Sequence, residues 1–164
     1  MLGREDVPPN SQQHWLWRAA VAEKGSELLR ELSQRPFAEA ASLADRALPE
    51  ALPAFDQSIR SSGTTTLFAD LARRALARAV VTRGGGDAFG PELFAEATGY
   101  FASRDLPSVV GGPGRVQTAK DALALKAALR GEVLSSMSRV SADPRSDWSA
   151  YVSEALNVLS GGKP

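Results

Sequence analysis

Cysteine is absent from this chain of 164 residues, and His14 is its single histidine. The absence of cysteine excludes disulfides, thiolate metal ligands and cysteine nucleophiles. A zinc site would need further nitrogen or sulfur ligands beside His14, and a catalytic triad would depend on His14 as its base. We therefore predict a protein that is not an enzyme, with no catalytic residue, no metal and no cofactor.

The chain also has no net charge and no long apolar run. Nineteen Lys and Arg side chains balance nineteen Asp and Glu. The chain therefore lacks the basic surplus that is typical of nucleic-acid-binding proteins, but this balance does not exclude a local basic patch. No apolar run approaches the roughly 20 residues that cross a bilayer, and the first residues lack the apolar core of a signal peptide. Together with the lack of cysteine, these features predict a soluble cytoplasmic protein without a membrane partner. Many Ala and Arg residues indicate a GC-rich bacterial gene.

Patterns typical of β-strands are missing as well. No segment alternates apolar and polar residues over a sustained stretch, and no repeat recurs at a fixed period. Apolar residues recur instead at helical spacing. We predict an all-α fold, a single compact bundle of about six or seven helices at 11–160 with two Gly-rich loops at 82–90 and 106–118. The ends at 1–10 and 161–164 are predicted to be flexible tails.

Caps, prolines and glycines set the predicted helix boundaries. A first helix is expected to end before Pro36, which opens the second helix, and Gly63 is placed to end the third. The predicted helix starts are Asn10 or Ser11, Pro36, Pro49, one of Thr64 to Thr66, Pro91, Thr118, and Ser146 or Asp147. The residues predicted to face inward include Leu28, Leu32, Phe37, Ala40, Phe55, Phe68, Leu71, Leu93, Phe94, Leu129, Val133, Met137, Trp148, Tyr151 and Val152.

The glycine-rich break at 106–118, LPSVVGGPGRVQT, offers a candidate anion site. Backbone amides and cations in the region Gly111–Lys120 precede a helix start, a combination that holds anions in many proteins. The candidate residues are Gly112, Gly114, Arg115 and Lys120. Gln117 stands where a Rossmann fingerprint needs its third glycine, and no Gly-Lys followed by Ser or Thr marks a P-loop. A small anion- or nucleotide-binding protein is one hypothesis, and a plain exposed loop is the alternative.

Two predicted helix faces gather charge. Arg74 and Arg78 lie one turn apart and are placed to contact successive phosphates of a nucleic acid. The full candidate set for nucleic acid is Arg73, Arg74, Arg78 and Arg83. The alternative is a solvated face whose cations complement the helix dipole. Glu92 and Glu96 share a face of the next helix, and we interpret this face as solvated rather than catalytic.

Trp15 and Trp17 point in nearly opposite directions on the first predicted helix, so one of them is expected outside the core. Because tryptophan is favoured at protein interfaces, this pair is a candidate interaction patch. Packing of the first helix against the last is the alternative interpretation. The leading prediction is a non-enzymatic helical interaction or assembly subunit of a bacterial multiprotein complex, whose partner is another protein or a second copy of this chain.

Two segments resemble a known layout. ALPAFDQSIRSSGTTTLFADLARR at 51–74, followed much later by AYVSEALNVL at 150–159, resembles the small helical subunit of type III CRISPR effector complexes. Those subunits are compact helical proteins that assemble along the complex beside the guide RNA. The resemblance implies a helical fold and an alternative function, that of a nucleic-acid-associated accessory subunit.

Overall fold

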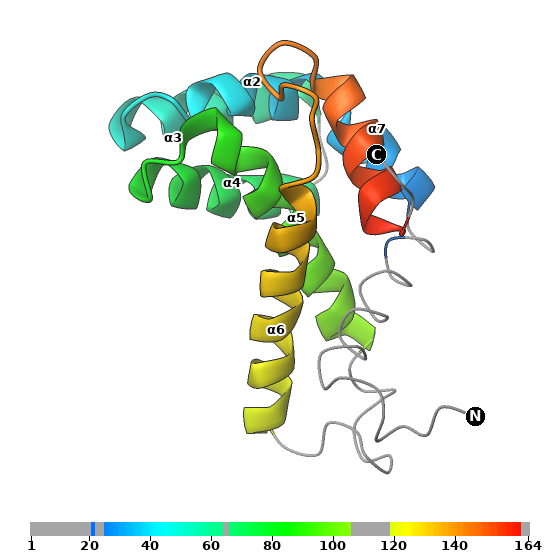
Figure 1. Ribbon diagram of the computed structural model, residues 1–164. Coiled ribbons are helices and arrows are strands. Elements are labelled where there is room, and N and C mark those ends of the chain that lie inside the picture. Colours follow the sequence, from blue (N-terminus) through cyan, green and yellow to red (C-terminus); the bar gives the residue numbers. More distant parts are fainter. Residues whose placement is uncertain (1–20, 22–24, 64–65, 106–118, 162–164) are drawn as a thin grey trace, which may run out of the picture.

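The computed structural model describes residues 21, 25–63, 66–105 and 119–161 (Figure 1). Within these ranges residues 25–32 are helical, and six further helices follow without any strand. They are α2 (Arg35–Leu43), α3 (Leu48–Ser62), α4 (Thr66–Val81), α5 (Gly85–Asp105), α6 (Ala119–Met137) and α7 (Trp148–Leu159). The all-α fold predicted from the sequence is confirmed. None of the described helices is long and apolar enough to cross a membrane.

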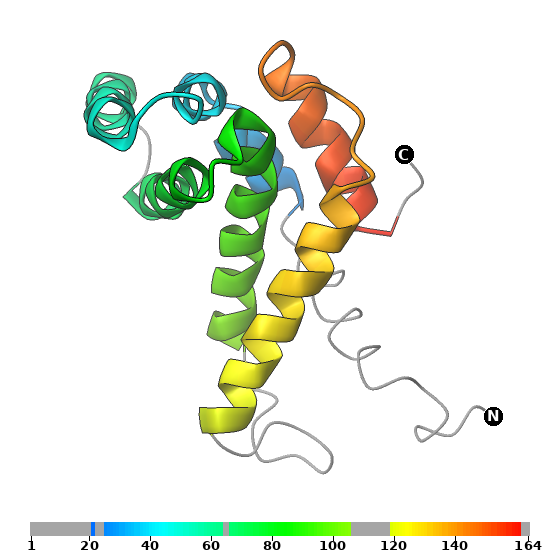
Figure 2. The same ribbon diagram turned by 60° about the vertical axis from the view of Figure 1, so that its left-hand side comes forward.

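Two long helices, α5 and α6, organise the molecule. They run side by side in opposite directions, and the shorter helices gather around the start of α5 and the end of α6 (Figures 1 and 2). The most extensive contacts between helices join α5 to α4 and α5 to α6, and α2 packs against both α3 and α5. The first turns of α5 therefore lie at the centre of the fold, in contact with segments from both halves of the chain.

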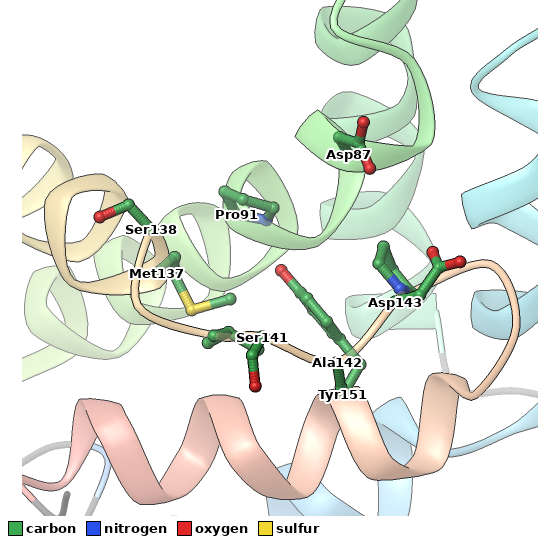
Figure 3. Close-up of a pocket in the computed structure, with 10 residues that line it drawn as sticks. Asp87, Pro91, Met137, Ser138, Ser141, Ala142, Asp143 and Tyr151 are labelled. Atoms are coloured by element: carbon green, nitrogen blue, oxygen red, sulfur yellow. The ribbon is translucent and has the colours of Figure 1, made fainter. Parts of the chain in front are cut away.

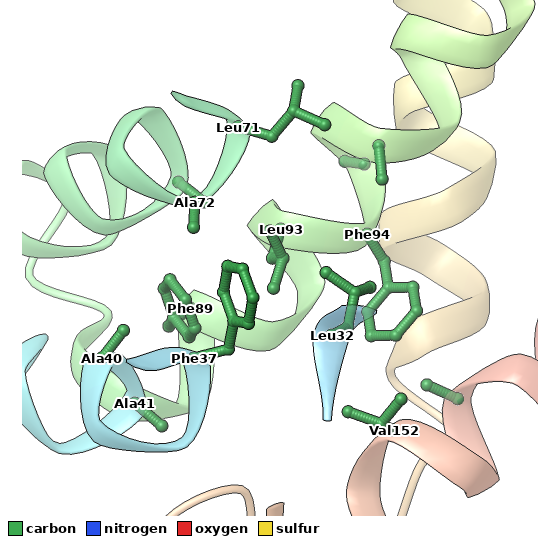
Figure 4. Close-up of a cluster of buried hydrophobic side chains, with 14 of the residues drawn as sticks. Leu32, Phe37, Ala40, Ala41, Leu71, Ala72, Phe89, Leu93, Phe94 and Val152 are labelled. Carbon is green, nitrogen blue, oxygen red and sulfur yellow. The ribbon is translucent and has the colours of Figure 1, made fainter. Parts of the chain in front are cut away.

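Phenylalanine and alanine dominate the core. Phe37, Phe55, Phe89 and Phe94 are fully buried. Figure 4 shows the rings of Phe37 and Phe89 beside alanines of α2 and α4 that are also inaccessible to solvent. Alanine allows helix axes to approach closely, while the aromatic rings fill the wider spaces between them. Most described residues that were predicted to face inward are buried, from Leu28 and Leu32 to Trp148, Tyr151 and Val152. Leu52 and Ile59, predicted as the buried side of α3, are only partly buried, and Leu29 is 40% exposed.

Most predicted helix ends are confirmed. Pro36 lies in the first turn of α2, and Pro49 lies in the first turn of α3, where a missing amide hydrogen costs nothing. Gly63 ends α3 in the left-handed conformation, with φ of 70°. The side chain of Asp147 accepts the amide of Ala150 at 3.0 Å and caps α7.

The predicted loop at 82–90 is wrong, because α5 begins at Gly85 instead of Pro91. The amide of Gly86 donates to Asp45 Oδ1 at 2.9 Å, so a side chain 41 residues away in sequence caps this helix. A Cβ at Gly86 would overlap the carbonyl oxygen of Ala41, and a Cβ at Gly90 would overlap the ring of Tyr151. These glycines permit close packing of α5 on α2 and α7. From composition alone, the same glycines had predicted a flexible loop.

Candidate functional site

Three of the four arginines predicted to bind nucleic acid, Arg73, Arg74 and Arg78, contact carboxylates of neighbouring helices. Arg73 donates from Nε to Asp56 Oδ1 of α3 at 3.1 Å and from Nη2 to the other carboxylate oxygen at 3.4 Å. Arg74 Nε lies 3.6 Å from Glu96 Oε2 of α5. Because each charge already faces an opposite charge of the same molecule, these arginines link α4 to the helices on either side.

Glu92 is the most buried carboxylate of this network, with 9% of its surface exposed. It contacts Arg130 of α6 through a charged hydrogen bond, and its Oε2 lies 3.9 Å from Arg78 Nε of α4. The interpretation of the Glu92 face as solvated is therefore wrong, because α6 covers it. Arg83 is exposed in the turn after α4 with φ of 61°, and it forms no ion pair within the described residues.

The other predicted site residues lie largely outside the described residues. Lys120 is in the first turn of α6, as predicted for the anion site. The remaining candidates outside the described ranges are Gly112, Gly114, Arg115, Trp15 and Trp17. The anion site and the tryptophan patch therefore remain predictions.

A pocket that the sequence did not reveal lies between α5, α6 and α7 (Figure 3). Its volume is about 370 Å³. The walls come from the start of α5, the end of α6, the connection 138–147 and α7. The lining residues are Asp87, Pro91, Met137, Ser138, Val140, Ser141, Ala142, Asp143, Pro144 and Tyr151.

Glu154 of α7 fixes the connection that forms one wall of this pocket. Its carboxylate accepts the amide of Ser141 at 2.9 Å, the hydroxyl of Ser141 at 2.8 Å and the amide of Ala142 at 3.0 Å. These hydrogen bonds hold the pKa of Glu154 below its usual range. The connection is thereby attached to α7 by three bonds to a charged group, which are stronger than bonds between neutral groups.

Arg145 joins three distant segments at the rim of the pocket. Its guanidinium forms a bidentate ion pair with Asp45, in which Nε lies 2.7 Å from Oδ2 and Nη2 lies 2.9 Å from Oδ1. Its Nη1 lies 2.7 Å from Asp87 Oδ1 of α5. The hydrogen bonds from Arg145 and from the amide of Gly86 lower the pKa of Asp45 to about 2, and the two carboxylates raise the pKa of Arg145. This ion cluster, defined as Asp45, Asp87 and Arg145, holds the end of α2, the start of α5 and the connection together.

Tyr151 presents an unpaired hydroxyl to the pocket. Its side chain is only 4% exposed, and its hydroxyl points from α7 toward Pro91 between Met137 and Asp143 (Figure 3). Its ring stacks on Trp148, with ring centroids 5.3 Å apart. The indole of Trp148 donates to the carbonyl of Leu32 at 2.6 Å, whereas the hydroxyl of Tyr151 has no hydrogen bond within the part of the chain that the structure covers. A buried hydroxyl without a protein partner is unusual in a native protein, and a water molecule or a ligand atom in the pocket would complete its hydrogen bonding.

Each of the three hydroxyl groups that line the pocket is protonated or already hydrogen-bonded. Burial raises the pKa of Tyr151, and the negative charges of Asp87 and Glu154 raise it further, so the hydroxyl stays protonated at neutral pH. The hydroxyl of Ser138 donates to the carbonyl of Ser135 at 2.6 Å, and that of Ser141 is bound by Glu154. Among the described residues no group of three or more His, Asp or Glu side chains is placed to hold a metal ion.

Comparisons with protein-family models, with curated proteins and with solved structures found no match to this chain. The structure places the first segment of the CRISPR-subunit resemblance on α3 and the first half of α4, which pack together. It places the second segment within α7.

Proposed function

We propose that this protein is a cytoplasmic, non-enzymatic interaction subunit that assembles with another protein in a bacterial multiprotein complex. The observation that carries the proposal is the buried hydroxyl of Tyr151, which has no hydrogen bond within the described residues and faces a pocket at the surface of the bundle. Leaving a buried hydroxyl without a partner costs about 1–3 kcal/mol. A group of a binding partner that reached this hydroxyl would offset that cost.

The rigidity of the pocket supports the proposal. Its rim is fixed by the ion cluster and its outer wall by Glu154, so the walls are in place before a partner arrives. Sites that are formed in advance lose less conformational entropy on binding. A pocket with these fixed walls suits recognition, and the raised pKa of Tyr151 keeps its hydroxyl protonated instead of nucleophilic.

The pairing of the arginines favours protein binding over the nucleic-acid alternative. Contacts with phosphates would require Arg73 and Arg74 to leave Asp56 and Glu96. Breaking each exposed pair costs up to about 1 kcal/mol, and the separated carboxylates would then repel the phosphates. The network is therefore better suited to holding α3, α4 and α5 together.

Native purification tests the proposal. A tagged chain, expressed at its natural level, is isolated after mild cross-linking, and co-purifying proteins are quantified. The expected result is one protein at a fixed ratio, which binds again when both are purified separately and mixed. In parallel, light scattering at micromolar and near-millimolar concentrations measures self-association. A chain that stays monomeric and brings down no protein at a fixed ratio would overturn the proposal.

Gel-shift assays at low salt distinguish the nucleic-acid alternative. We expect no shift with single- or double-stranded nucleic acid at micromolar protein. A shift that disappears in the double variant Arg74→Ala, Arg78→Ala, and persists in the matched variant Arg60→Ala of α3, would replace the interaction subunit with the nucleic-acid accessory subunit.

A further inference from the structure

We infer that the pocket beside Tyr151 holds the side chain of a lysine or arginine that the partner protein presents, an inference that rests on the proposed function. The cationic head would lie against the hydroxyl of Tyr151 and between the carboxylates of Asp87 and Asp143. The aliphatic stem would lie along the apolar walls. Three independent properties of the pocket support this occupant: its lining, its charge and its free hydroxyl.

The lining fits an aliphatic stem with a polar end. Pro91, Met137, Val140 and Pro144 supply apolar wall, and the exposed side chains of Asp87 and Asp143 supply two carboxylates. Lysine and arginine bury their stems on apolar surface and keep the charged head among polar groups. At about 370 Å³ the pocket is near the lower limit of ligand pockets, which run from about 300 to 1,000 Å³. Its size suits one side chain better than a cofactor.

The charge of the rim selects a cation. Asp87 and Asp143 line the pocket, and Glu154 lies directly behind the connection. None of the described residues that line the pocket is basic. Arg145, next to the lining residue Pro144, already pairs with Asp45 and Asp87 through all three guanidinium nitrogens, and its Nη1 lies 4.0 Å from Asp143 Oδ1. The carboxylates thus outnumber the cation, and a cleft lined by one sign of charge concentrates ions of the other sign. An anion would meet two carboxylates and no basic side chain among the described residues that line the pocket.

The hydroxyl of Tyr151 supplies the specific contact. Its oxygen is an available acceptor for the N–H of an ammonium or guanidinium group. Asp87 and Glu154 both raise the pKa of Tyr151 through their negative charge, and the same field stabilises a cation placed beside the oxygen. A hydrogen bond to a charged group is about twice as strong as one between neutral groups.

A titration of the full chain with blocked amino acids tests this inference without knowledge of the partner. The probes are N-acetyl-lysine methylamide and its arginine, norleucine and glutamate analogues, and amide shifts are followed by NMR. We expect saturable shifts of Ser138–Asp143 and Tyr151 with the lysine or arginine probe. Norleucine, which keeps the stem but lacks the charge, and glutamate are expected to bind at least about tenfold more weakly, as loss of a charged hydrogen bond predicts.

Matched variants assign the contact to the named groups. Tyr151→Phe should weaken the cationic probe about tenfold, whereas Tyr100→Phe on α5 should leave it unchanged. Asp87→Asn should also weaken binding, in contrast to Asp70→Asn on the exposed face of α4. Circular dichroism confirms that each variant is folded.

Three results would overturn the inference: no saturable shift with either cationic probe, equal binding of norleucine, or shifts confined to another part of the chain. If the probes fail while the chain still forms a complex of fixed ratio, the pocket assignment falls and the proposed function stands. If the probes bind but no protein partner exists, the proposed function falls and the pocket remains a cation site.

Discussion

The hydroxyl of Tyr151 has no hydrogen bond within the described chain, in contrast to the indole of Trp148 on which its ring stacks. A buried oxygen of this kind destabilises the isolated protein, because it loses its water and gains nothing in return. Natural proteins retain such defects mainly where function requires them. At this residue, stability and the proposed binding role are expected to oppose each other.

Tyr151→Phe is therefore predicted to raise the free energy of unfolding by about 1 kcal/mol, since it removes the unpaired hydroxyl and keeps the ring on Trp148. Urea denaturation measures the change. Tyr100→Phe is the matched control, with no expected gain, because this side chain is 36% exposed. A loss of stability in Tyr151→Phe would mean that the hydroxyl has a partner after all.

Gly90 is predicted to be irreplaceable for a steric reason. In Gly90→Ala the new methyl group would overlap the Tyr151 ring, and overpacking of this kind costs about 1–3 kcal/mol. Gly99 of the same helix has no atom within 4 Å of the place where a Cβ would be. Gly99→Ala should therefore stabilise the protein by about 0.5–1 kcal/mol through the lower entropy of its unfolded chain. Thermal unfolding of both variants distinguishes this account from simple helix propensity, which predicts a gain at both positions.

At the scale of helices, Glu92 links α5 to α4 through Arg78 and to α6 through Arg130. Arg130→Ala should lower the free energy of unfolding by about 2 kcal/mol, because the buried carboxylate loses its closest cation while Arg78 remains. Arg74→Ala removes a more exposed pair with Glu96 and should cost less than about 1 kcal/mol. Equal losses in the two variants, measured by urea denaturation, would contradict the assignment of Glu92 as the central link.

The helices themselves could largely be predicted from the sequence, because their signals are local. The spacing of Leu129, Val133 and Met137 predicts the buried face of α6, and Asp147 marks the start of α7. The start of α5 could not be predicted, since its cap comes from Asp45, far away in sequence. The burial of Glu92 escaped prediction for the same reason, because it depends on how α6 packs.

The candidate pocket was beyond sequence prediction because it depends on contacts between distant segments. Asp45 and Arg145 are 100 residues apart, and no local pattern connects them. The sequence indicated that Tyr151 is buried, but a free hydroxyl becomes evident only when all its neighbours are in place. Whether a buried polar group has a hydrogen-bond partner depends on how the whole molecule packs.

At the scale of the whole molecule, the ion cluster makes the stability depend on pH. The folded protein lowers the pKa of Asp45 from 3.8 to about 2, so the charged form favours folding. This contribution is complete above pH 3.8 and is lost as the pH falls toward about 2. Because the side chain of Asp45 is 42% exposed, the loss should stay below about 1 kcal/mol.

Asp45→Asn isolates this effect. Urea denaturation at neutral pH and at a pH between the two pKa values should show a smaller difference in stability for Asp45→Asn than for the unaltered chain. Asp56→Asn on α3 serves as the matched control, since its partner Arg73 joins only adjacent helices. An unchanged pH dependence in Asp45→Asn would mean that other carboxylates account for acid unfolding.

The stack of Trp148 on Tyr151 gives the pocket an optical reporter. Indole emission is sensitive to the polarity and charge around the ring, and this indole lies one ring away from the free hydroxyl. Replacing Trp15 and Trp17 by phenylalanine would leave Trp148 as the single source of tryptophan fluorescence. Arrival of a charged group in the pocket could then be followed by the emission of Trp148, at protein concentrations far below those that NMR requires.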